Sequence, residues 1–157
     1  MSRIVVLGTL FLVSAAQAGS FCKAGEVRVF ACSHGSKTAE LCAAEGDHGA
    51  LRYVQYRYGK ASPEVSVPTL GINPLAAVHA WVSNGTGGGG EAIEISQGPY
   101  VYGIQHDWKL LDQTTPAEIY VQKGGKLVTR FGCVVHADIL RVFITDHPAL
   151  TQRDAGQ

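Results

Sequence analysis

Short runs in which apolar and polar residues alternate recur along most of the chain, and this period of two is typical of β-strands. The pattern is clearest in residues 51–58, whose even-numbered positions from Val54 onward are apolar or aromatic. The opposite face of this strand carries Tyr53, Gln55 and Arg57. Further strands are expected at Glu26–Ser33, Lys37–Cys42, Glu64–Val67, Ala76–Ser83, Ala92–Ile95, Tyr100–Gln105, Glu118–Gln122 and Leu127–Phe131. The near-regular spacing of strands and turns predicts an all-β fold, either an antiparallel β-sandwich or a small barrel.

One short helix is expected near the C-terminal end, in residues 137–144. Leu140 and Phe143 would share an apolar stripe there with Ile139. Two β-branched residues in the same segment have a lower helix propensity and argue against it.

The first residues have the pattern of a targeting segment. A basic start is followed by the apolar run Ile4–Val13 and by a small-x-small pattern that ends at Ala18. The run is shorter than the roughly 20 apolar residues that cross a bilayer. We therefore expect residues 1–18 to be a cleaved signal peptide, and the protein to be periplasmic or secreted without a membrane span. Phe21 stands before Cys22 where a lipoprotein signal needs a small residue, which disfavours lipid anchoring.

Composition limits the remaining choices. Removal of the signal peptide leaves 139 residues with 12 basic and 13 acidic side chains, a balance that gives no general attraction for nucleic acid. This length suits one domain with a hydrophobic core. We expect a single β domain over residues 19–150 and a flexible tail over residues 151–157. The oligomeric state is not indicated by the sequence.

Four cysteines lie in the exported part of the chain, and an even count in an oxidising compartment favours two disulfides. No pair has the Cys-x-x-Cys spacing of structural zinc, and we expect neither a metal nor another cofactor. Of the three possible pairings we favour Cys32–Cys133 with Cys22–Cys42, because this scheme ties the first long strand to a late one. Closing so long a loop should stabilise the fold by roughly 3–5 kcal/mol.

Strand geometry argues against a bond between Cys32 and Cys42. The two strands that contain them look like a hairpin with a glycine-first two-residue turn at Gly35. This register places Cys32 opposite Ala39. It places Cys42 opposite Val29, so the two cysteine side chains would point to opposite faces of the sheet.

The most distinctive segment joins a glycine run, Gly87–Gly90, to a strand and a turn. The glycines permit a bulge or a bend, and they lack the following lysine and helix of a phosphate-binding loop. The turn is Ser96-Gln97-Gly98-Pro99, and it carries the hydroxyls of Ser96 and Tyr100 on either side of its tip. A rigid turn of this kind suits insertion into the cleft of another protein. The same pattern also fits a glycine-rich connection followed by an ordinary hairpin.

Catalytic motifs of the common hydrolase, metalloprotease and phosphate-binding types are missing from the sequence. Among the six histidines, only His136 would share a face with a nearby acid, Asp138, if that segment were extended. Glu91 and Glu94 stand three residues apart on a strand and would face opposite ways, which fits poorly with the paired acids of a glycosidase. The aromatic residues that could line a carbohydrate groove fit core packing as well. They are Trp81, Trp108, Tyr53, Tyr56, Tyr58, Tyr100 and Tyr102.

Three blocks of the chain together resemble a known group of exported β-domains. The blocks are Glu26–Ala43, Gln55–Lys60 and Gly87–Tyr102, with a later Gly124-Gly125-Lys126 leading to Cys133. In order and spacing they resemble periplasmic inhibitors of invertebrate-type lysozyme and related exported bacterial β-domains of unknown function. The resemblance implies a binding protein rather than an enzyme.

In that family, and in the similar C-type lysozyme inhibitors, a loop with Ser and Tyr around a Gly enters the lysozyme cleft and its hydroxyls bond the catalytic carboxylates. The matching positions here are Ser96, Gly98 and Tyr100, whereas Gln97 and Pro99 depart from the pattern. Pro99 fixes one backbone angle and would preorganise the loop or misplace Tyr100. The C-type inhibitors also imply a disulfide between a first and a last strand, in agreement with the favoured pairing.

Three hypotheses on the function follow. The leading hypothesis is an exported, non-enzymatic protein that binds a protein target, a lysozyme, through residues 96–100. The alternatives are an envelope hydrolase that uses His136 and Asp138 or the region of Glu91, and a structural or ligand-binding envelope domain without inhibitory activity.

Overall fold

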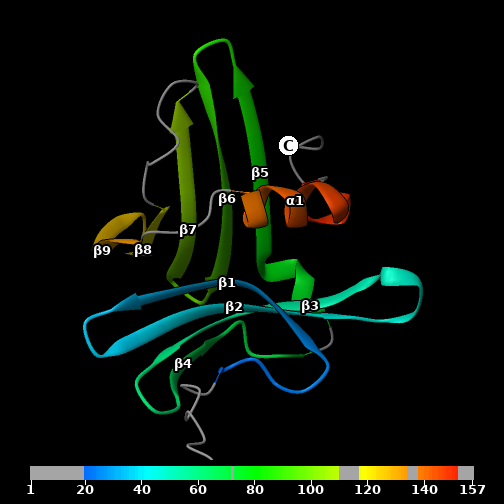
Figure 1. Cartoon of the computed structure of the whole chain (residues 1–157). Helices are drawn as coiled ribbons and strands as arrows, with labels where there is room; N and C mark the ends of the chain where they lie inside the picture. The colour runs from blue at the N-terminus through cyan, green and yellow to red at the C-terminus, as the bar shows by residue number, and fades with distance from the viewer. Residues whose placement is uncertain (1–19, 72, 110–116, 134–137, 152–157) are drawn as a thin grey trace, which may run out of the picture.

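Two antiparallel sheets make up most of the computed structural model, which describes residues 20–71, 73–109, 117–133 and 138–151. The four-stranded sheet consists of β1 (Glu26–His34), β2 (Lys37–Glu45), β3 (Leu51–Gly59) and β4 (Pro63–Val67), in that order. The five-stranded sheet consists of β5 (Val78–Gly85), β6 (Gly88–Gln97), β7 (Tyr100–Lys109), β8 (Ala117–Lys123) and β9 (Lys126–Cys133), also in chain order. The strands of one sheet run across those of the other (Figure 1). The all-β sandwich expected from the alternation is confirmed.

A single α-helix, α1 (Asp138–Asp146), is present among the described residues, as expected near the C-terminal end. It lies against β1, β5 and β6 and so closes one side of the sandwich next to the four-stranded sheet (Figure 1). Its apolar stripe buries Leu140, Phe143 and Ile144. The described ranges also contain three short 3-10 helices that the alternation did not indicate: η1 (Asp47–Gly49), η2 (Pro74–Ala77) and η3 (Pro148–Leu150).

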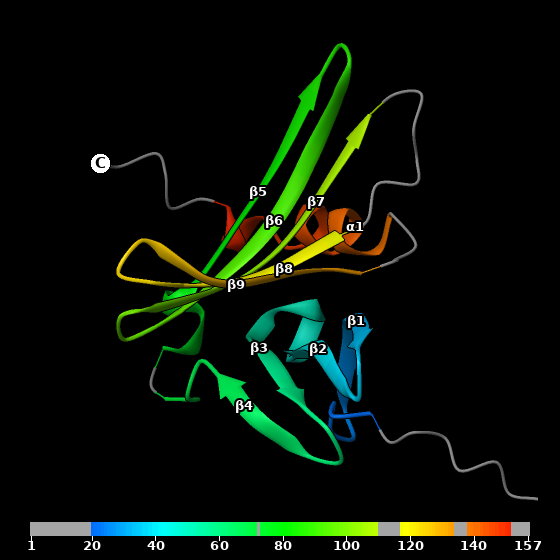
Figure 2. The same cartoon turned by 90° about the vertical axis from the view of Figure 1, so that its left-hand side faces the viewer.

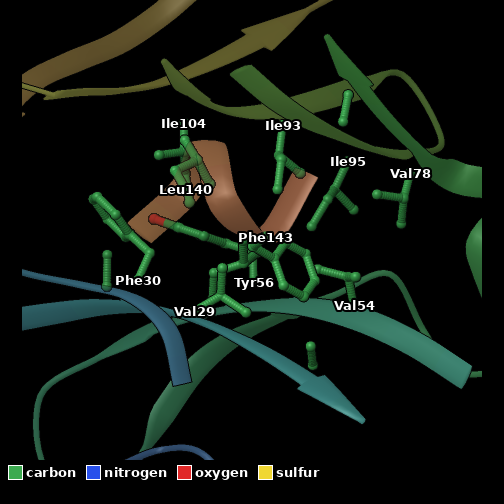
Figure 3. Close-up of a cluster of buried hydrophobic side chains, with 14 of the residues drawn as sticks. Val29, Phe30, Val54, Tyr56, Val78, Ile93, Ile95, Ile104, Leu140 and Phe143 are labelled. Carbon is green, nitrogen blue, oxygen red and sulfur yellow. The ribbon is translucent and has the colours of Figure 1, made fainter. Parts of the chain in front are cut away.

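The core lies between the two sheets and under α1. Figure 3 shows side chains of β1 and β3 facing those of β5, β6 and β7, with Leu140 and Phe143 of the helix beside them. The labelled core residues from the strands are Val29, Phe30, Val54, Tyr56, Val78, Ile93, Ile95 and Ile104. The alternation in residues 51–58 therefore identified the inward face of β3 correctly.

A β-bulge in β1 shifts the register of the first hairpin. Cys32 pairs with Ala39 as expected, but Cys42 pairs with Arg28 rather than with Val29, because the register slips between Arg28 and Phe30. The bulge lets two consecutive residues of β1, Val29 and Phe30, both reach the core. The bulge lies in β1 and leaves the alternation of side chains along β2 unchanged. Cys32 and Cys42 therefore still point to opposite faces of the sheet.

The disulfides are Cys22–Cys42 and Cys32–Cys133, the pairing favoured by the sequence, with Cα–Cα distances of 5.4 Å and 5.7 Å. Cys32–Cys133 joins β1 to β9 and therefore ties the two sheets together. Cys22–Cys42 fastens the chain before β1 to the outer face of the four-stranded sheet. Both bonds have ordinary disulfide separations.

A buried polar network occupies that outer face. Arg57 donates two hydrogen bonds to the Glu26 carboxylate, at 2.5 Å and 2.7 Å, and the side chains of both residues are only 2% exposed. Tyr53 donates to the same carboxylate at 2.5 Å, and Gln55 accepts from the guanidinium at 2.7 Å. The face predicted for Tyr53, Gln55 and Arg57 is therefore a satisfied charged cluster beneath the N-terminal segment.

The N-terminal segment is held on this cluster by a second buried carboxylate. Glu40 accepts hydrogen bonds from Ser20 Oγ at 2.8 Å and from the backbone N–H of Phe21 at 2.7 Å. Arg57 also donates to the Phe21 carbonyl at 2.6 Å. Residues 1–19 and 152–157, which include the expected signal peptide and most of the expected tail, lie outside the described residues.

The glycine run is a regular strand, and the expected bulge or bend there is wrong. β6 begins at Gly88, and its pairing with β5 and β7 continues without a register shift. The reason is close packing of side chains on both faces of the run. A Cβ on Gly89 would lie 2.6 Å from a ring carbon of Trp108. A Cβ on Gly90 would lie 2.4 Å from Asp107 Oδ1, on the other face.

Candidate functional site

The turn between β6 and β7 is a tight two-residue connection. Gln97 pairs with Tyr100, so only Gly98 and Pro99 lie between the strands. Gly98 has a φ of +57°, in the left-handed region that favours glycine at the first position of such a turn. Ser96, Gly98 and Pro99 are exposed, and Gln97 and Tyr100 are partly buried. The structure therefore presents the sequence-predicted loop as the end of a regular hairpin.

Neighbouring segments brace the turn on two sides. Gln97 accepts a hydrogen bond from the Thr69 backbone N–H at 2.9 Å and donates to Thr69 Oγ1 at 3.2 Å. On the other side, the Gly124 N–H of the β8–β9 turn donates to the Pro99 carbonyl at 2.8 Å. Figure 2 shows the β6–β7 and β8–β9 turns side by side at one end of the five-stranded sheet. These contacts reduce the conformational freedom of the turn.

The two hydroxyl-bearing residues lie on opposite faces of the hairpin. Tyr100 pairs with Gln97 and Ser96 with Val101, and side chains of successive strand residues alternate. Tyr100 lies on the inner face, where its ring centroid is 6.3 Å from that of Tyr102. Lys123 Nζ lies 5.2 Å from the Tyr100 ring centroid, within the range of a cation–π contact. The ring of Tyr100 therefore has two side-chain neighbours that limit its movement.

Sequence reasoning missed the residues that brace the turn. Thr69 and Gly124 come from segments that are 28 and 25 positions away from the residues they bond. The Gly124-Gly125 pair does signal a tight turn, and both residues have positive φ values, of +54° and +75°. Nothing in that pattern indicates which strand end the turn would touch.

The two acidic residues weighed as a catalytic pair lie on opposite faces of β6, as their spacing predicted. Glu91 faces inward, is 1% exposed and lies 2.8 Å from His106 Nδ1. Its Oε2 atom has no hydrogen-bond partner among the described residues. Glu94 faces the other side and accepts a hydrogen bond from the Tyr120 hydroxyl. The two acids therefore cannot flank one bond of a sugar.

Tyr120 crosses the neighbouring strand to reach Glu94. Its ring lies so close to Gly103 that a Cβ there would come within 2.1 Å of it. Burial, and next the hydrogen bond to Glu94, raise the pKa of the Tyr120 hydroxyl well above its usual value. The phenol therefore stays protonated at neutral pH and acts as a hydrogen-bond donor that fixes Glu94.

The other catalytic candidates are not brought together within the described chain. His136 lies outside the described residues, and Asp138 is the first residue of α1 rather than part of an extended segment. His147 is engaged at the end of α1, with Nδ1 2.8 Å from the Phe143 carbonyl and Nε2 3.4 Å from Glu45.

The aromatic residues considered for a carbohydrate groove are divided among different places. Tyr56 is 3% exposed in the core, and Tyr53 lies in the polar network on the outer face of the four-stranded sheet. Trp81 and Trp108 cover opposite faces of the glycine run, and Arg141 stacks over Trp108 at 5.3 Å. They do not form one aromatic strip.

One group in the described chain has the spacing of metal ligands. The sulfurs of Cys22 and Cys42 and a carboxylate oxygen of Glu26 lie within 4.8 Å of one another. The two sulfurs are bonded to each other, and the carboxylate is bonded to the Arg57 guanidinium. A cation there would need free thiolates and would meet the charge of Arg57, so these residues act as structural links.

No family model, curated protein or solved structure matches this chain. No helix in the described ranges has both the length and the apolar character needed to cross a membrane. The braced β6–β7 turn remains the strongest candidate site on geometric grounds.

Proposed function

We propose that this is an exported, non-enzymatic binding protein that inserts the β6–β7 turn into the cleft of a protein target, and that the target is a lysozyme. The observation that carries the proposal is the exposed turn braced by Thr69 and Gly124. Two disulfides support export, because such bonds persist in oxidising compartments. The lysozyme class follows from the sequence resemblance.

The positions of the hydroxyls fit such a target. Glycosidases carry two carboxyl groups roughly 5–10 Å apart on the two sides of the bond they cleave. A hairpin that enters such a cleft end-on would direct Ser96 toward one wall and Tyr100 toward the other, because these residues lie on opposite faces. Each hydroxyl can donate a hydrogen bond to a carboxylate or accept one from a protonated acid.

Bracing favours tight binding. An ordered loop loses little conformational entropy on association, and the fixed φ of Pro99 adds to the order that the hydrogen bonds supply. The departure from the family pattern at Gln97 has a structural role here, since its side chain forms both bonds to Thr69. Gln97 and Pro99 are thus compatible with a functional loop.

The test is inhibition of cell-wall lysis by a panel of lysozymes that includes an invertebrate-type enzyme. Hydrogen bonds to charged groups contribute about 1.5–3 kcal/mol, so Ser96→Ala and Tyr100→Phe should each weaken inhibition about 10- to 100-fold. Tyr100→Phe keeps the ring that packs against Lys123 and Tyr102. Ser66→Ala, at an exposed position of β4, is the matched control and should inhibit like the wild type.

Two results would reject the proposal. One is a correctly disulfide-bonded wild-type protein that inhibits no enzyme of the panel. The other is undiminished inhibition by the Ser96→Ala, Tyr100→Phe double variant, which would move the contact away from the turn.

A further inference from the structure

The connection between β4 and β5 lies directly beside the candidate turn and carries an exposed apolar side chain. Thr69 in this connection forms both hydrogen bonds to Gln97, and the next residue, Leu70, is 40% exposed. Large apolar side chains with this much exposure are few in the described chain. The others are Val27, Leu127, Val128 and Val142.

The backbone immediately before Leu70 is anchored to both sheets. The carbonyl of the buried Pro68 accepts a hydrogen bond from Gln55 Nε2 at 3.0 Å, which ties it to β3. The Thr69 N–H is tied to β6 through Gln97. Leu70 therefore directly follows two residues that are bonded to the sheets, and its side chain is exposed to solvent.

The opposite flank of the turn is basic. Lys123 and Lys126 begin and end the β8–β9 turn, both are exposed, and within the described ranges neither has a carboxylate partner. The Gly124 N–H bond to Pro99 keeps this flank against the β6–β7 turn. Charge complementarity therefore favours a target surface lined by carboxylates, as the cleft of a glycosidase is.

We infer that the docking surface is composite, and that Leu70 is its apolar anchor, seated in a recess at the rim of the cleft that the β6–β7 turn enters. This inference rests on the proposed function and adds a contact that the sequence resemblance does not contain. Full burial of a leucine side chain contributes about 1.5–3 kcal/mol, so an exposed leucine that enters a recess of the target would add measurably to the affinity. Leu70 would also influence which lysozyme is bound, because the shape of a cleft rim differs between enzymes more freely than the position of its catalytic acids.

The experiment measures the affinity for an invertebrate-type lysozyme by calorimetry. Leu70→Asp should weaken binding by about tenfold or more, and Leu70→Met, which keeps an apolar side chain, should stay within about threefold of the wild type. Val142→Asp is the control, because Val142 is 55% exposed but lies on α1. It should bind like the wild type.

Hydrogen exchange supplies a readout without any substitution. Addition of the lysozyme to the wild-type protein should slow exchange of the amides of Leu70 and Gly71 as well as that of Tyr100. If exchange slows at Tyr100 but is unchanged at Leu70 and Gly71, the inference of a composite surface is rejected and the proposed function still stands.

The remaining outcomes are also decisive. Wild-type affinity in Leu70→Asp removes Leu70 from the interface, and equal weakening in Leu70→Asp and Val142→Asp shows a general charge effect that overturns the inference. Failure of the wild-type protein to bind any lysozyme rejects the proposed function and this inference with it.

Discussion

The buried carboxylate of Glu26 should make the stability of the protein depend on pH in the acid range. Hydrogen bonds from Arg57 lower the pKa of Glu26 from 4.5 to about 2, even though burial alone would raise it. Between these values the unfolded chain binds a proton at Glu26 that the folded protein does not. The stabilisation is therefore complete above pH 4.5 and is lost as the pH falls toward 2.

The size of the effect follows from the shift. A difference of about 2.5 pKa units corresponds to about 3 kcal/mol of unfolding free energy, and the side chain is only 2% exposed, so solvent screening is weak. Glu26→Gln keeps the shape of the side chain and removes the charge. Breaking a buried pair in this way typically costs about 3–5 kcal/mol.

Urea unfolding of the wild type and of Glu26→Gln, followed by circular dichroism from pH 7 to pH 2, directly measures the gap between their unfolding free energies. We expect a gap of about 3 kcal/mol at pH 7 that narrows steadily below pH 4.5. Glu64→Gln is the control, because its pair with Lys37 is half-exposed and should contribute little. A gap that stays constant across the acid range, or that is no larger than that of Glu64→Gln, refutes the reasoning.

Two further predictions concern the packing and the covalent links. Gly103→Ala should destabilise the fold by about 1–3 kcal/mol in urea unfolding, since its Cβ would lie 2.1 Å from Tyr120. Gly87→Ala, with no atom within 4 Å, should change little, and equal effects of the two would contradict the packing argument. Replacing Cys32 and Cys133 by Ala should cost about 5 kcal/mol, more than the about 3 kcal/mol expected for the other disulfide, because the closed loop spans 101 rather than 20 positions. Thermal unfolding that ranks the two losses in the opposite order would contradict this loop-length argument.

The strands could be predicted because their signal is local. Alternation in residues 51–58 identified the inward and outward faces of β3. The alternation of side chains along β2 was enough to predict that Cys32 and Cys42 point to opposite faces and are not bonded to each other. The bulge at Val29 left no such signal. It depends on which residues of β1 the opposite sheet can accommodate, and that is a property of the assembled core.

The glycine run shows the same limit more clearly. Gly89 and Gly90 suggested freedom of the backbone, whereas their actual role is to leave room for the side chains of Trp108 and Asp107 on the neighbouring strand β7. Similarly, the turn at Gly98 was recognisable, but its bracing by Thr69 depends on a loop whose place is set by the four-stranded sheet. Local sequence patterns were enough to predict the strands and turns. The structural role of individual residues depends on contacts between segments that are distant in the sequence.

The two disulfides have a mechanical consequence, because they interlock along the chain. A force applied to the two ends reaches Cys32 from Cys22 by two routes, directly along ten residues of chain, or across the first bond to Cys42 and back along ten residues, and then crosses the second bond to Cys133. Only these two ten-residue segments can lengthen between Cys22 and Cys133, each to no more than about 35 Å. Strands β3 to β8 lie outside the path that bears the load. A protein tethered at its ends would thus keep the β6–β7 turn and its supports unstretched under tension.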